Sequence, residues 1–191
     1  MVITYQGENY FKFQAGSLTV LLDPTNQRSF KGAQVVLSTL KPALVATEEI
    51  DGEPIFIDHQ GEYEIKGIEI RGFSAQNDGK TEKTIYLLKF DEIKIAVLGH
   101  LSKELDEKTI THLENAHIVI APAGGKPYIN TETVAKIIKE INPSIIIPSL
   151  FKDIKPFLKN FQKNSCETTE KIVVKAKDLK PGALEIKCLT P

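Results

Sequence analysis

The chain has 191 residues, of which 41% are hydrophobic, so its length suits a single domain with a substantial hydrophobic core. Its formal net charge of −1, from 24 basic and 25 acidic side chains, argues against a general binder of polyanions. Two cysteines, Cys166 and Cys188, are too few for a disulfide framework or a cysteine-based zinc site, and the four histidines form no HxH or HxxxH pair.

The first half of the chain has the two-residue alternation that is typical of strands. Strands are expected over residues 10–15, 17–22, 35–37, 68–71, 84–90 and 93–98. Asp91 and Glu92 separate the last two and predict a two-residue hairpin loop.

The second half changes to a mixture of strands and helices. Strands are expected over 117–121, 144–147, 172–174 and 184–186, with a helix over 102–113. A second helix should begin at Asn130 or Thr131 and end at Asn142-Pro143, and a helical apolar stripe recurs from Ile154 to Phe161. This order predicts a layered α/β or α+β sandwich, which we take as one domain over residues 1–191.

The start of the sequence has no basic region followed by an apolar stretch, and no apolar run is long enough to span a membrane. These features predict a cytoplasmic protein in which both cysteines are reduced thiols, with no membrane among its partners.

Function in open α/β sheets gathers in the loops that leave the carboxyl ends of strands. Five such loops can be identified, at residues 38–42, 74–78, 99–101, 122–125 and 148–150. His100, Asn77, Asp78 and Ser149 lie in them and are the candidates for chemistry, together with Glu8 near the start of the chain.

The order of short motifs resembles the metallo-β-lactamase superfamily, in particular the small zinc-dependent hydrolases related to ascorbate-6-phosphate lactonase. The motifs are ITYQG from residue 3, VLLDP from 20, GEYEI from 61, TIY from 84, PAGG from 122 and NPSIIIP from 142. The resemblance covers nearly the whole chain and implies a four-layer αββα sandwich with a zinc-dependent hydrolytic site.

The metal ligands that the resemblance implies are missing. Family members carry His-x-His-x-Asp-His after a buried strand, and the four ligand positions of this motif are occupied here by Leu40, Pro42, Leu44 and Val45. The remaining positions are occupied by other residues as well: Asn77 and Leu150 replace histidines, His100 replaces the bridging aspartate, and Glu8 replaces the histidine near the first strand.

Aliphatic and proline side chains offer no donor atom to zinc, and without zinc no hydroxide forms at neutral pH. The sequence therefore predicts a metal-free, degenerate member without a cofactor, in which apolar side chains partly fill the metal pocket. Its predicted role is non-catalytic: binding, regulation or assembly with a protein or small molecule, with a homo-oligomer left open.

Two alternatives remain. One is a hydrolase with an improvised site around His100, Asn77 and Asp78, with Glu8 and Ser149 as further candidates. The other is weak nucleic-acid binding through a lysine-rich helical face formed by Lys152, Lys155, Lys159 and Lys163, although a solvated face is the simpler interpretation.

Overall fold

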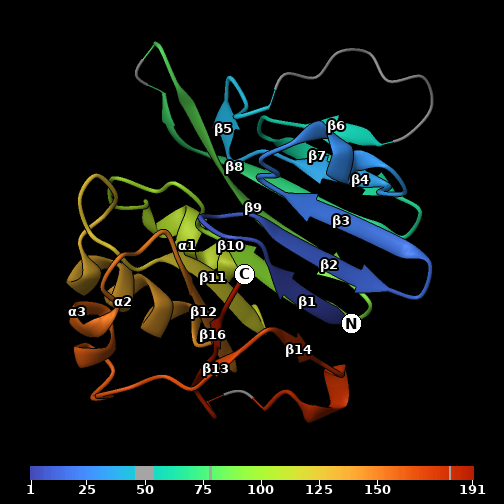
Figure 1. Ribbon diagram of the computed structural model, residues 1–191. Helices are drawn as coiled ribbons and strands as arrows, with labels where there is room; N and C mark the ends of the chain where they lie inside the picture. The colour runs from blue at the N-terminus through green and yellow to red at the C-terminus, as the bar shows by residue number, and fades with distance from the viewer. Residues whose placement is uncertain (46–53, 78, 181) are drawn as a thin grey trace.

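The computed structural model describes residues 1–45, 54–77, 79–180 and 182–191. Two β-sheets pack face to face, and helices cover the outer face of the larger sheet (Figure 1). The smaller sheet has the order β14-β1-β2-β3-β4-β6. Its strands are β1 (Val2–Tyr5), β2 (Phe11–Ala15), β3 (Leu18–Leu22), β4 (Val35–Leu37), β6 (Ile55–Ile57) and β14 (Lys171–Val173).

The larger sheet has the order β15-β12-β11-β10-β9-β8-β7, and a short strand, β5, pairs with β9 beside this path. Its strands are β5 (Leu40–Lys41), β7 (Gly61–Ile65), β8 (Ile68–Asn77), β9 (Glu82–Phe90), β10 (Ile93–Val97), β11 (Ile118–Pro122), β12 (Ile145–Ser149) and β15 (Glu185–Ile186). A third, two-stranded sheet joins β13 (Thr168–Thr169) and β16 (Cys188–Leu189).

The helices are α1 (Glu107–Leu113), α2 (Thr131–Ile141) and α3 (Lys155–Lys159), with 3₁₀ turns at η1 (Gln27–Phe30) and η2 (Ala176–Asp178). The Asn130 side chain caps α2 by accepting a hydrogen bond from the Thr133 amide at 2.8 Å. Asn142 ends α2 in the left-handed conformation, with φ 56°. Both ends of α2 therefore lie where the sequence predicts them.

Two apolar clusters define the layers. One fills the space between the sheets and includes Phe11, Phe13, Tyr86 and Leu88. The other lies between the larger sheet and the three α-helices. The outer face of the smaller sheet is covered differently, because in the described part of the chain its cluster is closed by Phe30 of η1.

The predicted sandwich is confirmed, and so is the hairpin at Asp91 and Glu92. Both residues have a positive φ, 54° and 61°, and Phe90 pairs with Ile93 across the turn. Such values are typical of the two-residue turn whose twist matches the flanking strands. None of the helices in the described ranges is long and apolar enough to cross a membrane.

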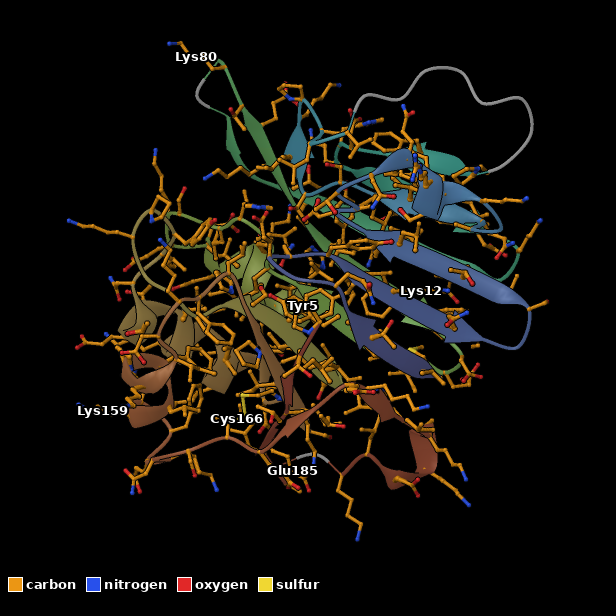
Figure 2. The ribbon with its side chains drawn as sticks, viewed as in Figure 1. Tyr5, Lys12, Lys80, Lys159, Cys166 and Glu185 are labelled. Carbon is orange, nitrogen blue, oxygen red and sulfur yellow. A yellow bond between two sulfur atoms is a disulfide. The ribbon has the colours of Figure 1, made fainter. Side chains whose placement is uncertain are left out.

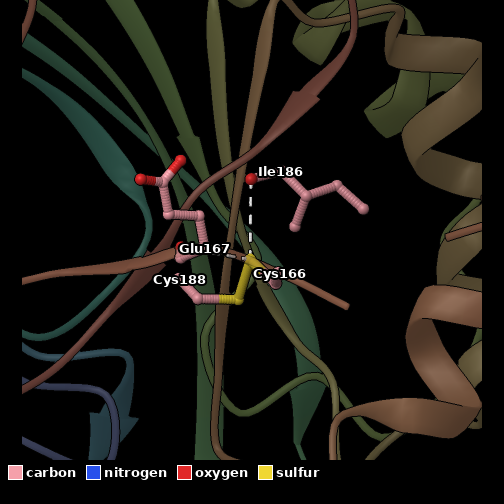
Figure 3. Close-up of a disulfide and its surroundings, with 4 residues drawn as sticks. All are labelled: Cys166, Glu167, Ile186 and Cys188. Carbon is pink, nitrogen blue, oxygen red and sulfur yellow. Dashed lines mark hydrogen bonds between the residues drawn. A yellow bond between two sulfur atoms is a disulfide. The ribbon is translucent and has the colours of Figure 1, made fainter. Parts of the chain in front are cut away.

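The prediction of two reduced thiols is wrong. Cys166 and Cys188 form a disulfide, with their Cα atoms 6.0 Å apart (Figure 3). The two cysteines are 22 residues apart in the sequence, so sequence reasoning did not predict that they meet. They come together because β13 pairs in parallel with β16, which contains Cys188. The predicted cytoplasmic location stays a prediction, and it loses the support that reduced thiols would have provided.

Candidate functional site

The ends of four strands bring polar side chains together at one edge of the sandwich. Asp23 follows β3, Thr39 follows β4, His100 follows β10, and Ser149 ends β12. Asn9, from the loop between β1 and β2, completes the cluster. The pairs β3–β4 and β11–β12 are parallel, as is β10–β11, so their carboxyl ends meet at this edge.

The Asp23 carboxylate is the centre of the cluster and is only 2% exposed. One oxygen accepts the Thr39 backbone amide at 2.7 Å. The other accepts the Thr39 hydroxyl at 2.6 Å and the Asn9 side-chain amide at 2.6 Å. Both carboxylate oxygens are therefore satisfied by donors from the protein itself, as a buried charge requires.

His100 and Ser149 extend this network to either side. Thr39 Oγ1 lies 2.7 Å from His100 Nδ1, and Ser149 Oγ donates to Asn9 Oδ1 at 2.8 Å. Because the Thr39 hydroxyl donates its proton to Asp23, it accepts from His100 Nδ1–H. The neutral ring is thus held as the tautomer whose Nε2 is the acceptor.

Burial lowers the pKa of His100 below its usual value, and the nearby Asp23 carboxylate only partly offsets this effect. The imidazole is therefore neutral at pH 7. The Tyr86 hydroxyl is buried beside the same edge, donates to the Ser38 carbonyl at 2.9 Å, and has its pKa raised, chiefly by burial. Both groups are held in their uncharged forms.

The backbone of Gly99 lies so close to the Thr39 side chain that only glycine fits there. Gly99 has φ 51°, and a Cβ atom added there would lie 2.6–2.8 Å from the Thr39 side chain. Any larger residue would push Thr39 away from His100 and Asp23. The local conformation at Gly99 therefore contributes directly to the arrangement of the network.

The apolar residues at the positions where the resemblance implies metal ligands do not form one filled pocket. Leu150 is buried and Leu40 is half-buried. Val45 packs on the outer cluster of the smaller sheet, whereas Leu44 is 51% exposed and Pro42 is exposed. The centre of the site contains hydrogen-bonded polar groups, so the expectation that apolar side chains occupy it is only partly met.

Within the described residues, Glu8 forms no hydrogen bond to the network through its side chain. Glu8 is exposed, and its backbone carbonyl, rather than its carboxylate, accepts from the Tyr5 hydroxyl and the Leu150 amide. Asn77 ends β8 opposite Glu82. Asp78 lies outside the described residues. Of the predicted candidates, the structure places His100 and Ser149 in the network.

The prediction that four lysines share one helical face is wrong. Helix α3 has five residues, Lys155–Lys159, so Lys152 precedes it and Lys163 follows it. All four lysines are exposed. The apolar stripe beneath them is real, since Phe157 and Leu158 are buried, but the chain turns away after Lys159.

Asp23, Thr39 and Asn9 were not among the predicted site residues. The VLLDP motif was a usable signal, because an acidic residue directly after a buried strand is rarely left without a role. Thr39 and Asn9 gave no such signal, since their importance comes only from their distances to Asp23.

The donor atoms at this edge do not fit the zinc ion of a hydrolytic site. Within the described ranges, no three His, Cys, Asp or Glu residues form a group that could hold a metal ion. Asp23 and His100 do lie close together, with 3.6 Å between the carboxylate oxygen Oδ2 and Nδ1, but each of these atoms is engaged by Thr39. Two engaged donors fall short of the usual tetrahedral shell.

Comparison with known proteins agrees with this architecture. The family model of the beta-lactamase superfamily domain matches residues 2–149, so the chain belongs to that superfamily. A search of curated proteins gave no match.

Several solved structures share the fold. A candidate zinc-dependent hydrolase of the metallo-β-lactamase superfamily from Thermotoga maritima is 22% identical, with a TM-score of 0.81 and 99% coverage of both chains. The metallo-β-lactamase fold protein YhfI from Bacillus subtilis is 11% identical, with a TM-score of 0.68 and coverage of 98% and 95%. These likenesses establish the fold.

Proposed function

We propose that this chain is a metal-free member of the superfamily with a non-catalytic role in binding, regulation or assembly, formed by one domain over residues 1–191. The observation that carries the proposal is the saturation of Asp23, whose two oxygens accept three hydrogen bonds from Asn9 and Thr39. A metal ion would have to displace these donors and leave them unsatisfied in a buried site.

The chemistry of the ligand positions supports the same proposal. Leucine, valine and proline side chains have no atom that coordinates zinc, and no metal-bound hydroxide can form without the metal. The edge instead offers a hydrogen-bonded polar surface around His100, which is 8% exposed. Such a surface suits recognition of a partner better than bond cleavage.

The test is elemental analysis of the purified protein after exposure to zinc and manganese and removal of unbound metal. We expect far less than one metal ion per chain, and no increase in melting temperature with either metal. A stoichiometric metal that is lost in Asp23→Ala, but retained in the surface variant Glu64→Gln, would overturn the proposal.

A second candidate, a hydrolase with an improvised site, is favoured by one specific observation. The chain of contacts from Asp23 through Thr39 to His100 orients the imidazole and leaves Nε2 as a base, much as an acid orients a catalytic histidine. Hydrolysis of p-nitrophenyl acetate tests it. A tenfold or greater loss of rate in His100→Gln, with no loss in His117→Gln, would support the hydrolase, and equal rates would exclude His100 as the base.

Nucleic-acid binding through the lysines stays a prediction. The lysines are exposed, but only Lys155 and Lys159 lie on the same helix, and the segment contains no arginine for bidentate phosphate contacts. A salt-dependent affinity that falls in the quadruple Lys→Ala variant would revive it.

A further inference from the structure

A second cavity lies away from the polar edge network. It has a volume of about 490 Å³ and is formed by α3, the end of β1, the segment after β12 and the C-terminal residues. In Figure 2, Tyr5 and Cys166, which both line it, are labelled near the centre and below it, and the label of Lys159 marks the last residue of α3. Its volume falls in the range typical of small-molecule sites.

The walls of this cavity are mainly apolar. The rings of Tyr5 and Phe151 contribute aromatic surface, and Ile154, Leu158 and Leu189 contribute aliphatic surface. Leu158 and Leu189 are buried, so these walls belong to the packed interior and are not loose surface side chains. An occupant of this space must therefore present a substantial apolar portion to it.

The charged side chain in the lining is a lysine. Lys155 lines the cavity, is exposed, and forms no ion pair with any residue that the structure describes. Ser165, Thr168 and Thr190 are residues of the same lining, and hydroxyl groups of this kind can donate hydrogen bonds. An unpaired ammonium beside hydroxyl donors complements an anionic oxygen group on the occupant.

The disulfide ties two walls of the cavity together. Cys166 and Cys188 both line it, and they join the segment after α3 to β16. Figure 3 shows Cys166 Sγ against the Ile186 carbonyl oxygen, 3.5 Å away. The pairing of β13 with β16 spans only two residue pairs, and such a short ladder is weak alone. The covalent bond therefore keeps the two walls at a fixed separation.

We propose that this cavity is a binding site for a small amphipathic carboxylate, with the apolar chain against Phe151 and Leu158 and the carboxylate at Lys155, and that the Cys166–Cys188 disulfide keeps it in a binding-competent shape. The site does not depend on the polar edge network or on the absence of metal there. Its test is therefore independent of the metal analysis.

Decanoate is the probe, titrated calorimetrically into the oxidised protein at a concentration below micelle formation. We expect one molecule per chain, and roughly threefold to tenfold weaker binding in Lys155→Glu. The matched control is Lys159→Glu, an exposed lysine on the same helix that is outside the lining, which should bind as the wild type does. Decanol, which lacks the charge, should bind equally to both variants.

Two further measurements keep the result interpretable. Methyl NMR of the wild-type protein should show decanoate-dependent shifts at Ile154, Leu158 and Leu189. Reduction of the disulfide should weaken binding at least threefold. Absence of binding, equal weakening in both lysine variants, shifts confined to other methyl groups, or affinity unchanged by reduction would overturn the proposal, as would a dimer in solution that covers the cavity.

Discussion

The edge network around Asp23 and the cavity beside α3 are organised in opposite ways. At the edge, buried polar groups satisfy one another, and Asp23, Thr39 and Asn9 have their strongest contacts within the protein. In the cavity, the walls are mainly apolar, and the charged side chain of the lining, Lys155, has no ionic partner in the described residues.

The difference shows where binding capacity remains in this fold. A site whose donors and acceptors are already paired gains little from a ligand, because each new contact replaces an existing one. A site with exposed apolar walls and an unpaired charge can gain binding free energy from apolar contacts and from a new ion pair. The polar edge around Asp23 thus acts as a structural centre, and the cavity beside α3 is the site that we propose for binding.

Removal of the Asp23 carboxylate should have the largest effect. Asp23→Ala leaves the Thr39 amide and the Asn9 side-chain amide without their acceptor in a buried site. We expect a loss of about 3–5 kcal/mol in the free energy of unfolding, measured by urea denaturation. The exposed substitution Glu64→Gln should change it by less than about 0.5 kcal/mol. A loss below about 1 kcal/mol would mean that the network is not the structural centre of the edge.

Removal of the disulfide should come next. For a loop of 22 residues, the chain-entropy argument gives a loss of about 3 kcal/mol in Cys166→Ser/Cys188→Ser. Urea denaturation with and without a reductant measures it. The reductant should destabilise the wild type and leave the double variant unchanged, and an equal response of both proteins would contradict the proposed role.

Two buried serines at opposite ends of β12 form a matched pair. Ser149 donates to Asn9, whereas Ser144 Oγ is buried without a hydrogen-bond partner in the described structure. Ser149→Ala should lower the free energy of unfolding by about 1–2 kcal/mol, and Ser144→Ala should leave it unchanged or raise it slightly. Thermal and urea unfolding of both variants measure this, and the reverse order would show that the edge network contributes no net stability.

The smallest expected effect is a pH dependence. Because burial lowers the pKa of His100 in the folded protein, the unfolded chain binds its proton at a higher pH than the folded chain does. Stability should therefore be complete above about pH 6.5 and decrease as the pH falls below it. His100→Gln should flatten this dependence more than His117→Gln, whose pKa burial also lowers but whose ring is less buried. Urea unfolding at about pH 7.5 and pH 5.5 compares them.

Much of the fold could be predicted from local patterns. The caps of α2 at Asn130 and Asn142 and the turn at Asp91 and Glu92 are decided by neighbouring residues, so short-range reasoning found them. The end of α3 was missed because its apolar stripe continues to Phe161, while the backbone leaves the helix at Asn160 and Gln162 adopts a positive φ of 57°. Tertiary packing overrode the periodicity there.

The sequence by itself identified leucine, proline and valine at the four positions where the resemblance implies the His-x-His-x-Asp-His ligands, because side-chain chemistry is a property of each residue alone. It also determined the sandwich, since apolar periodicity sets which faces are buried. Only the tertiary structure decided that Asp23, Thr39 and His100 form one hydrogen-bonded network and that Cys166 meets Cys188. Hydrogen bonds and disulfides depend on separations of a few ångströms between distant segments, and those separations exist only once the sheets have packed.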